Sequence, residues 1–289
     1  MTIQPVNPAN YTRRRVFSLL MDMVCSLAAL VGLIVLALIL FELVQKGMHG
    51  LSPTLFTNQM MTPGNNGGLA NAIAGTLIQT GIGIAIGAPL GMAAGIYLAE
   101  VGRNSRFASV VRFVNDILLS APSVLVGLFV YQIVVVPMGG FSGLAGSIAL
   151  ALLAMLVIAR TTEDIVKLVP DTYREGSSAL GARDSATTLR VVVPAAFGGI
   201  LTGVLLAVAR ISGETAPLIF TSLGNFNWNT DLTKPMASLP IAIYRYASSP
   251  YEEWINLAWT GALVITAGVL LLNVLSRVSH YLVSRGASR

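Results

Sequence analysis

The stretch DTYREGSSALGARDSATTLRVVVPAAFGGILTGVLLAVARISGETAP, from Asp171 to Pro217, joins a polar segment to an apolar one. Its first half is charged and lies between two apolar runs. Its second half is long enough to enter a membrane and carries Arg210 and Glu214 near its end. The polar half is suited to contact a soluble partner, and the charges in the apolar half are suited to contact an anion within the bilayer. The rest of the chain is expected to be the membrane scaffold that connects the two.

Composition assigns the chain to the membrane. Of its 289 residues, 54% are hydrophobic and only 11% are charged, and the mean hydropathy is +0.74. A soluble protein of this length needs more charge on its surface, so the bilayer is its solvent. Cys25 is a single cysteine, and His49 and His280 are far apart in the sequence. Neither a disulfide framework nor a metal site is therefore expected.

Uncharged runs predict an all-α membrane protein with six transmembrane helices in one domain, residues 1–289. The expected spans lie at about 19–44, 69–99, 113–136, 141–160, 194–221 and 255–281. Residues 117–159 are uncharged over twice the length of one span, and Pro137 to Gly140 supply the turn of a helical hairpin. The basic start at Arg13 to Arg15 also fits a signal peptide. The apolar run is long enough to span, however, and no small-residue cleavage site follows it, so we interpret it as a first helix.

The basic residues are distributed unevenly about these spans. With a cytoplasmic amino terminus, fourteen of the 18 Lys and Arg residues fall on the cytoplasmic side: Arg13, Arg14, Arg15, Arg103, Arg106, Arg112, Arg160, Lys167, Arg174, Arg183, Arg190, Arg277, Arg285 and Arg289. This asymmetry predicts that both termini are cytoplasmic. It also accounts for the net charge of +5 without a nucleic-acid-binding surface.

Four glycines recur at every fourth position of the second apolar run: Gly83, Gly87, Gly91 and Gly95. This spacing places them on one helix face, where a second backbone can approach closely. The neighbour is either another helix of the same chain or a helix of a second membrane subunit, and the sequence leaves both open. Pro89 lies among the four glycines and predicts a kink.

Residues 171–193 are expected to form a cytoplasmic loop of two short helices. Asp171 follows Pro170 and is placed to cap the first helix, and Gly181 is placed to end it in a left-handed conformation. Asp184 or Ser185 would begin the second helix, which leads into the membrane. Such a protrusion fits a cleft on another protein, although a solvated amphipathic loop has a similar composition.

The spacing of this loop resembles the EAA loop of permeases from ABC importers. Glu175-Gly176-Ser177 stand where that family has Glu-Ala-Ala, Gly181 follows after three residues, and Val191 to Pro194 stand where it has Ile-x-Leu-Pro. Gly176 and Ser177 depart from the two alanines, and Gly176 weakens the first helix by up to about 1 kcal/mol relative to alanine. The resemblance implies that Glu175, Gly176, Ser177, Gly181 and Pro194 couple the chain to an ATPase subunit.

The chain contains no G-x-x-x-x-G-K-[ST] motif, which is the phosphate-binding loop of many ATPases. ATP and Mg²⁺ are therefore expected on a separate ATPase polypeptide. This chain is expected to bind no cofactor and to catalyse no reaction of its own.

Arg210 lies 16 residues beyond Pro194, about 24 Å along a helix, and therefore near the middle of the bilayer. Glu214 follows one turn later and is placed to pair with it. One interpretation is a self-neutralising pair that packs helices. The other is that Arg210 faces an aqueous path and attracts an anion. Glu214 would then either hold Arg210 when no anion is present or accept a hydrogen bond from a protonated phosphate oxygen. Arg160 is a weaker candidate for the path, because a basic residue at an inner helix end is commonly a topology anchor.

The sequence around these charges, ARTTE at 159–163 and ARISGETAPL at 209–218, resembles the phosphate-importer branch of the same family. Residues 236–241 and 257–264 are similar to its PstA-type permease rather than to its PstC-type permease. The resemblance implies import of inorganic phosphate across the bacterial plasma membrane, with Arg210, Glu214 and Arg160 important for transport. It also implies three partners: a PstC-type permease, a dimer of PstB-type ATPase and an extracytoplasmic PstS-type phosphate-binding protein.

Three other functions are compatible with the residues. One arginine does not name its anion, so phosphonate, molybdate or sulfate could replace phosphate. A secondary transporter or channel would need an ion-coupling site, and apart from Arg210 and Glu214 no ionisable residue is expected deep in a span. A membrane scaffold without transport would make the EAA-like spacing accidental.

Aromatic residues gather in the outer segment 222–253: Phe226, Trp228, Tyr244, Tyr246 and Tyr251. They either contact an extracytoplasmic binding protein or anchor the chain at the depth of the lipid headgroups.

Overall fold

The computed structural model describes the backbone of residues 8–286 and the surroundings of side chains 13–274, and it is helical almost throughout. The helices are α1 (Pro8–His49), α2 (Pro53–Thr57), α3 (Ala70–Ala99), α4 (Arg106–Ser120), α5 (Ser123–Val130), α6 (Val136–Met138), α7 (Gly143–Lys167), α8 (Asp171–Ala179), α9 (Asp184–Thr187), α10 (Val193–Ser212), α11 (Ala216–Thr221), α12 (Leu239–Ala247) and α13 (Glu252–Gly286). Within these residues the only β pairing is an isolated bridge between Leu223 and Met236. The side chains of Arg277, His280 and Arg285, and all of Arg289, lie outside the described part.

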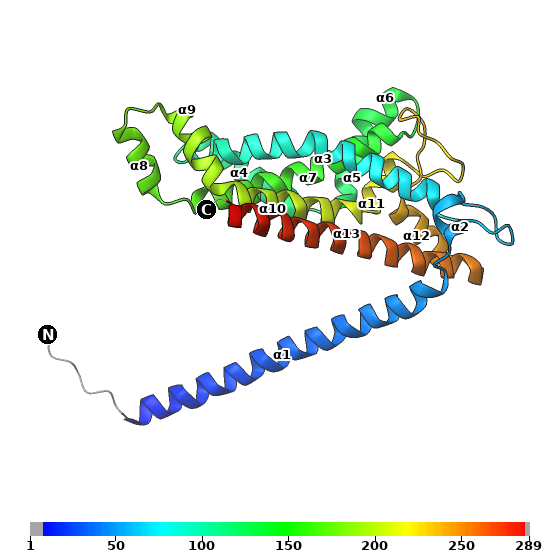
Figure 1. Cartoon of the computed structure of the whole chain (residues 1–289), viewed down its shortest axis with the longest axis horizontal. Helices are drawn as coiled ribbons and strands as arrows, with labels where there is room; N and C mark the ends of the chain where they lie inside the picture. Colours follow the sequence, from blue (N-terminus) through cyan, green and yellow to red (C-terminus); the bar gives the residue numbers. More distant parts are fainter. Residues whose placement is uncertain (1–7, 287–289) are drawn as a thin grey trace.

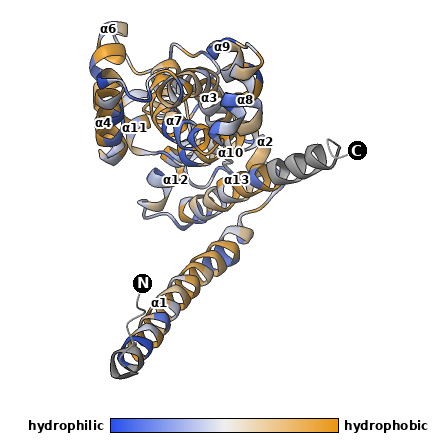
Figure 2. Cartoon of the chain, turned by 90° about the vertical axis from the view of Figure 1, so that its left-hand side faces the viewer, coloured by the Kyte–Doolittle hydropathy of each residue, from blue (hydrophilic) through white to orange (hydrophobic). Residues whose placement is uncertain are grey.

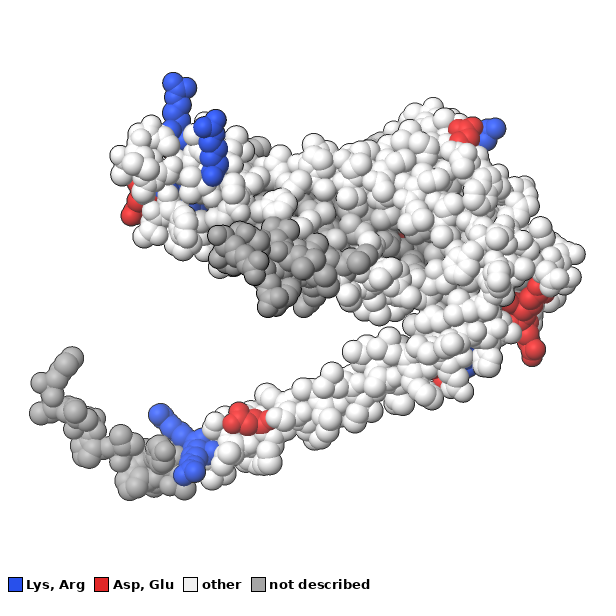
Figure 3. All heavy atoms as spheres, viewed as in Figure 1, with Lys and Arg blue, Asp and Glu red and all other residues white. Residues whose placement is uncertain are grey.

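Five helices in the described part are long and apolar enough to cross a membrane, and a bent pair of helices makes a sixth span if it is counted as one. The five are built on α1, α3, α7, α9 to α10 and α13. The expected all-α membrane fold is thus confirmed. The charged spheres in Figure 3 gather at the α8–α9 end, at the opposite end and near the start of α1, which leaves the middle of the visible face nearly uncharged.

The span expected at 113–136 is wrong in one respect, because it is not a single rod. Arg106–Ser120 and Ser123–Met138 meet at an angle of 105°. Pro122 causes the break. It has no N–H for a helical hydrogen bond, and its ring pushes Ala121 into the extended region, at φ −71° and ψ 145°.

The glycine stripe of α3 packs on α7 within the same chain. A Cβ atom added at Gly87, Gly91 or Gly95 would lie 2.6–2.8 Å from a backbone oxygen of α7. A real Cβ atom is not tolerated at that distance, so the two backbones touch only because these residues lack one. Pro89 lies within α3, which continues to Ala99.

The helix α10 covers another part of α7, where Gly203 and Gly199 make room for the side chains of Thr161 and Ile165. The buried centre of the bundle lies where α3, α7 and α10 meet, and it includes Ala154, Ile158 and Ala207. The span expected at 194–221 ends earlier than predicted. Helix α10 stops at Ser212, and α11 begins at Ala216, with Pro217 in its first turn.

Two segments of π-helix occur, at Tyr131–Val135 and Thr188–Val192, and each ends two residues before a proline. These prolines are Pro137 and Pro194. A proline leaves the carbonyl four residues earlier without its usual donor, and a wider π turn reassigns the hydrogen bonds around it. The chain therefore keeps its helical direction through both prolines.

Helix α1 diverges from the bundle (Figure 1), and none of its apolar window is buried within the chain. Figure 2 shows this helix as mainly hydrophobic along its length. It joins the bundle near its carboxyl end, where Gly47 packs on Leu263 of α13. Lys46 lies 4.9 Å from the ring centre of Trp259, a cation–π contact that closes the same joint.

We expect Gly87→Val to destabilise the α3–α7 pair, because the added side chain meets the Ala151 carbonyl oxygen at 2.6 Å from its first carbon. Overpacking of this kind costs about 1–3 kcal/mol. Gly81→Val is the matched control, since Gly81 lies on the same helix with nothing within 4 Å. Thermal unfolding in detergent measures the difference, and equal stability of the two variants would contradict the close contact.

Candidate functional site

The segment expected to form the loop contains one short helix, α8, followed by the beginning of a much longer one. Helix α8 ends at Ala179, and Gly181 has φ +79°, the left-handed conformation that glycine adopts without strain. The second helix begins at Asp184 and continues through the π segment into α10, so that Asp184–Ser212 is one helix of 29 residues. Pro194 lies exposed in the first turn of α10. The loop is therefore continuous with a membrane helix on its α9 side.

The prediction that Asp171 caps α8 is wrong. Pro170 occupies the cap position without a side-chain hydrogen bond, and Asp171 is the first helical residue. Its carboxylate accepts hydrogen bonds from Arg103, at 3.1 Å, and from Arg174, at 3.2 Å. The hydrogen bond from Arg103 lowers the pKa of Asp171 below its ordinary value. The Asp171 carboxylate thus accepts its hydrogen bonds from two arginines and not from the free amide groups of the helix.

Most of the outer face of α8 is exposed in the part of the chain that the structure describes. No residue of α8 is buried, Glu175 is exposed, and a Cβ atom added at Gly176 would meet nothing within 4 Å. Tyr173 is 53% exposed and Leu180 is 90% exposed. A polar helix that presents a tyrosine and a leucine to solvent has the properties of a docking element.

The inner face of α8 is held by Arg174 and Ser177. The Arg174 guanidinium donates two hydrogen bonds through Nε to Glu100 and one through Nη2 at 2.6 Å. Ser177 Oγ lies 2.8 Å from Thr187 Oγ1, which links α8 to α9. Hydrogen bonding to Glu100 raises the pKa of Arg174 above its ordinary value. Ser177, one of the two departures from the EAA pattern, therefore has a specific contact.

Arg210 and Glu214 lie on either side of the end of α10. Arg210 Nε is 3.8 Å from Glu214 Oε1, a distance for an ion pair without a hydrogen bond. The Arg210 side chain is 47% exposed and that of Glu214 is 15% exposed. Within this chain Arg210 is therefore only loosely held, and its guanidinium remains able to donate hydrogen bonds elsewhere.

Arg210 belongs to a face of α10 that is left exposed by the residues whose side chains the structure describes. Thr202, Leu206 and Arg210 are all exposed and are spaced four residues apart, which places them on one stripe. The adjacent face, with Gly203 and Ala207, packs on α7 and the buried core. Within the described part of the chain, this stripe therefore lies on the outer surface of the bundle.

Arg160 does not join Arg210 in the described contacts. It donates to Asp164 of its own helix at 3.1 Å and to Asp116 of α4 at 3.2 Å. Both ion pairs are exposed, and the one with Asp116 joins α7 to α4. Arg160 thus connects two helices and keeps its place as a weaker candidate for the path.

A buried carboxylate, Glu163, is a polar site that the sequence analysis missed. Its side chain is 2% exposed and accepts hydrogen bonds of 2.5 Å from Arg112 of α4 and from Lys167 of α7. Arg112 also donates to the backbone oxygens of Leu98 and Gly102. The spacing of Glu163 and Lys167, four residues apart, was the available signal. The contact with Arg112 joins residues 51 positions apart and has no local signature.

The outer aromatic residues divide into two groups. Phe226 and Tyr246 pack inside the chain, so they neither face a binding protein nor anchor the chain at the lipid headgroups. Tyr246 is fully buried, its ring stacks on Trp254 at 4.7 Å, and Phe226 packs beside both. These rings form an internal cluster because α12 and α13 pack against each other there. Trp228, Tyr244 and Tyr251 are more than half exposed and remain available for either role.

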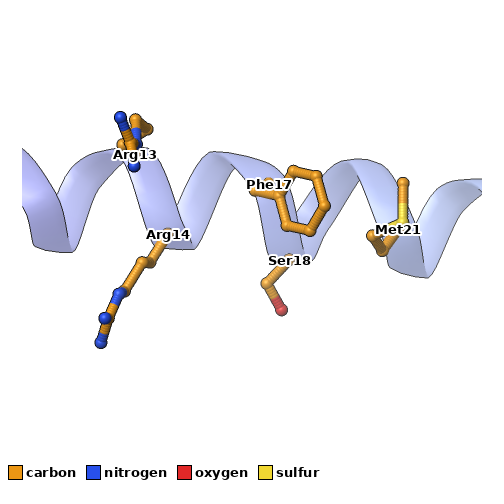
Figure 4. Close-up of a pocket in the computed structure, with 5 residues that line it drawn as sticks. All are labelled: Arg13, Arg14, Phe17, Ser18 and Met21. Atoms are coloured by element: carbon orange, nitrogen blue, oxygen red, sulfur yellow. The ribbon is translucent and has the colours of Figure 1, made fainter.

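A surface groove on α1 is lined by Arg13, Arg14, Phe17, Ser18 and Met21 (Figure 4). Arg13 and Arg14 point away from each other, and every lining residue belongs to one helix. Two divergent guanidinium groups do not enclose an anion, so this groove is the side of an isolated helix rather than a binding site.

Comparison with known proteins identifies the class. Residues 87–289 match the family described as the binding-protein-dependent transport system inner membrane component, and the chain belongs to this family. It is therefore a multi-pass inner membrane permease, as the resemblance predicted at family level.

Relatives within the family point to one kind of permease. The chain is 56% identical to a Yersinia pestis protein named phosphate transport system permease protein PstA, over 89% of this chain and 88% of that protein. It is 51% identical to the Haemophilus influenzae protein of the same name, over 87% of this chain and 89% of that protein. A structure of the MetNI methionine ABC transporter in an inward-facing conformation matches with a TM-score of 0.58 at 20% identity, over 72% of this chain and 90% of that one. This last likeness concerns the fold alone.

Two glycines of the loop provide a matched prediction. We expect Gly176→Ala to stabilise α8 by up to about 1 kcal/mol, because alanine favours a helix and the site is open. We expect Gly181→Ala to destabilise the loop by about 1 kcal/mol, because alanine strains the left-handed conformation. Amide hydrogen exchange across residues 171–187 measures both effects. The same sign of change in both variants would contradict the backbone assignment.

We expect Glu163→Ala to lower the free energy of unfolding by about 1–3 kcal/mol, because it leaves the partly buried Arg112 and the half-exposed Lys167 without their shared carboxylate. Asp164→Ala is the control and should cost less than about 1 kcal/mol, since its pair with Arg160 is exposed. Thermal unfolding of the two variants in detergent separates them. A Glu163→Ala variant as stable as Asp164→Ala would show that the buried pair contributes little.

Proposed function

We propose that this chain is a transmembrane permease subunit of an ATP-driven importer of inorganic phosphate. The assignment of phosphate as substrate rests on sequence identities of 56% and 51%, over most of the chain, to proteins named phosphate transport system permeases. The geometry supports it through a partly exposed arginine on an otherwise apolar, uncovered helix face. A guanidinium there would attract an oxyanion by charge and by paired hydrogen bonds.

In this proposal the path is shared with a second, PstC-type permease. Such a subunit would cover the stripe of Thr202, Leu206 and Arg210 and supply the other wall. A PstS-type binding protein would deliver phosphate from outside, and Glu214 would hold Arg210 between transport events. Both termini would be cytoplasmic, which places α8 and α9 in the cytoplasm of a bacterial cell.

Energy would come from a PstB-type ATPase dimer that binds ATP and Mg²⁺, so this chain would not itself be an enzyme. The exposed face of α8, with Glu175, Gly176 and Leu180, would dock on the ATPase. Closure of the ATPase would then move α8 and α9 together with the long helix that begins at Asp184. Gly181 and Pro194 mark the bend of the loop and the entry of that helix into the membrane.

The first test is uptake of labelled phosphate by vesicles that contain the whole assembly and ATP. Arg210→Gln removes the charge and the paired donors, and we expect uptake to fall at least about tenfold, the loss that accompanies a charge-assisted hydrogen bond. Lys234→Gln is the control, because it removes a charge that is 69% exposed in the 222–238 segment. Excess molybdate, sulfate and phosphonate should leave phosphate uptake by the wild type unchanged.

Undiminished uptake by an assembled Arg210→Gln variant would contradict the role of this residue in the path. Competition by another oxyanion, together with weak uptake of phosphate, would instead contradict the substrate. The two failures are therefore distinguishable within one set of vesicles.

A further inference from the structure

The end of α3 and the inner face of α8 share a partly buried cluster of charges. Glu100 is the residue that follows α3, and its carboxylate receives three hydrogen bonds from the Arg174 guanidinium of α8. The Glu100 side chain is 11% exposed and the Arg174 side chain is 18% exposed. Bidentate pairing of arginine with a carboxylate is the most directional ion pair that side chains form. Low exposure also protects this pair from screening by salt.

Arg174 is at the same time bound to the end of α7. Its Nη1 donates to the Val169 oxygen at 2.7 Å, and its Nη2 donates to the Val166 oxygen at 3.1 Å. The last carbonyl groups of a helix have no partner within the helix and carry its negative dipole end, so a guanidinium satisfies both needs. One side chain of α8 therefore contacts the ends of the two helices that the glycine stripe packs together.

Among the residues whose side chains are described, few other contacts hold α8 in place. No residue of α8 is buried, and a cavity of about 640 Å³ lies between the loop and α3. Glu100, Arg174, Ser178, Asp184 and Thr188 are among its lining residues. The remaining polar contacts are the Ser177 to Thr187 hydrogen bond and the exposed pair of Arg103 with Asp171. Because the cavity separates α8 from the end of α3, apolar side chains do not connect the two there. The hydrogen bonds of Arg174 do connect them, and can transmit a movement of α8.

We propose that Arg174 and Glu100 are positioning residues that clamp α8 to the α3–α7 pair, so that movement of the loop reorients these helices and not only α10. This inference rests on the proposed function, because it concerns how ATPase closure reaches the membrane helices. The loop then has two attachments: the continuous α9–α10 helix and the Arg174–Glu100 clamp. Without the clamp, α8 would tilt over the cavity, and ATP hydrolysis would proceed with little movement of the path.

The test uses the complete assembly in vesicles and measures phosphate uptake per ATP hydrolysed. We expect Glu100→Gln and Arg174→Gln to lower this ratio by about fivefold or more, within the range of couplings between distant sites. The double variant should be no worse than the poorer single variant, because both changes remove one shared contact. Arg174→Lys keeps the charge and should recover part of the ratio.

Arg103→Gln is the matched control, because Arg103 also joins the α3 end to α8 but through a pair that is more than half exposed. It should leave the ratio within about twofold of the wild type, since exposed pairs contribute little. Thermal stability and retention of the ATPase are measured on the same preparations. If Arg174→Gln does not assemble, Glu100→Gln carries the test, because it leaves the contacts of Arg174 with α7 in place.

An unchanged ratio in the assembled Glu100→Gln variant would overturn the clamp, as would a loss of stability with a normal ratio in the surviving complexes. Additive losses in the double variant would also overturn it, since the two residues would then act separately. A wild-type assembly that hydrolyses ATP without importing phosphate would contradict the proposed function instead. The clamp and the proposed function therefore fail by different results.

Discussion

Close contact between the backbones of α3 and α7 is the constraint on which the rest of the structure depends. Lipid is as apolar as the helix surfaces, so helices in a bilayer associate through packing rather than through escape from water. Glycines at every fourth position of α3 permit that packing, and Gly199 and Gly203 permit it again where α10 meets α7. Helix α7 is consequently the centre of the bundle, and the other helices are placed relative to it.

Charged side chains extend this packing at the end where α3 and α7 leave the apolar core. Glu163 connects α7 to α4 through Arg112, while Glu100 connects α3 to α8 through Arg174. Helix α4 needs such links, because its Phe107, Val110 and Phe113 point away from the bundle and are more than half exposed. Apolar contact fixes the centre of the chain, and ion pairs fix the elements that surround its α8–α9 end.

Local features of the fold were predictable from the sequence, and features made by distant residues were not. The glycine period and the left-handed Gly181 depend on neighbouring residues, so the pattern alone predicts them. The length of the uncharged run at 117–159 predicted a span at about 113–136 but not its direction, and so missed the turn at Pro122. Asp171 does not cap α8 as expected, because its carboxylate pairs with Arg103, which lies 68 positions away.

The candidate site shows the same division. Arg210 and Glu214 were predicted to meet because they are one turn apart, and they do face each other, although at 3.8 Å and across the end of α10. Glu163 was overlooked because the expected span ended at residue 160, whereas α7 continues to Lys167 and keeps this carboxylate buried. The aromatic cluster of Tyr246 with Trp254 required knowing that α12 folds back on α13.

The helix from Asp184 to Ser212 joins the two halves of the site. Its 29 residues extend about 43 Å at the standard rise, with the end next to α8 at one side and Arg210 in the last turn at the other. A continuous helix transmits a tilt along its whole length, so a small rotation at Asp184 displaces the far end most. Because α10 stops at Ser212, and α11 is held separately by the contact of Pro217 with Gly127 of α5, Arg210 would move relative to Glu214. Their long and weakly held ion pair is the contact that such a movement would break at least cost, which would free the guanidinium for an anion.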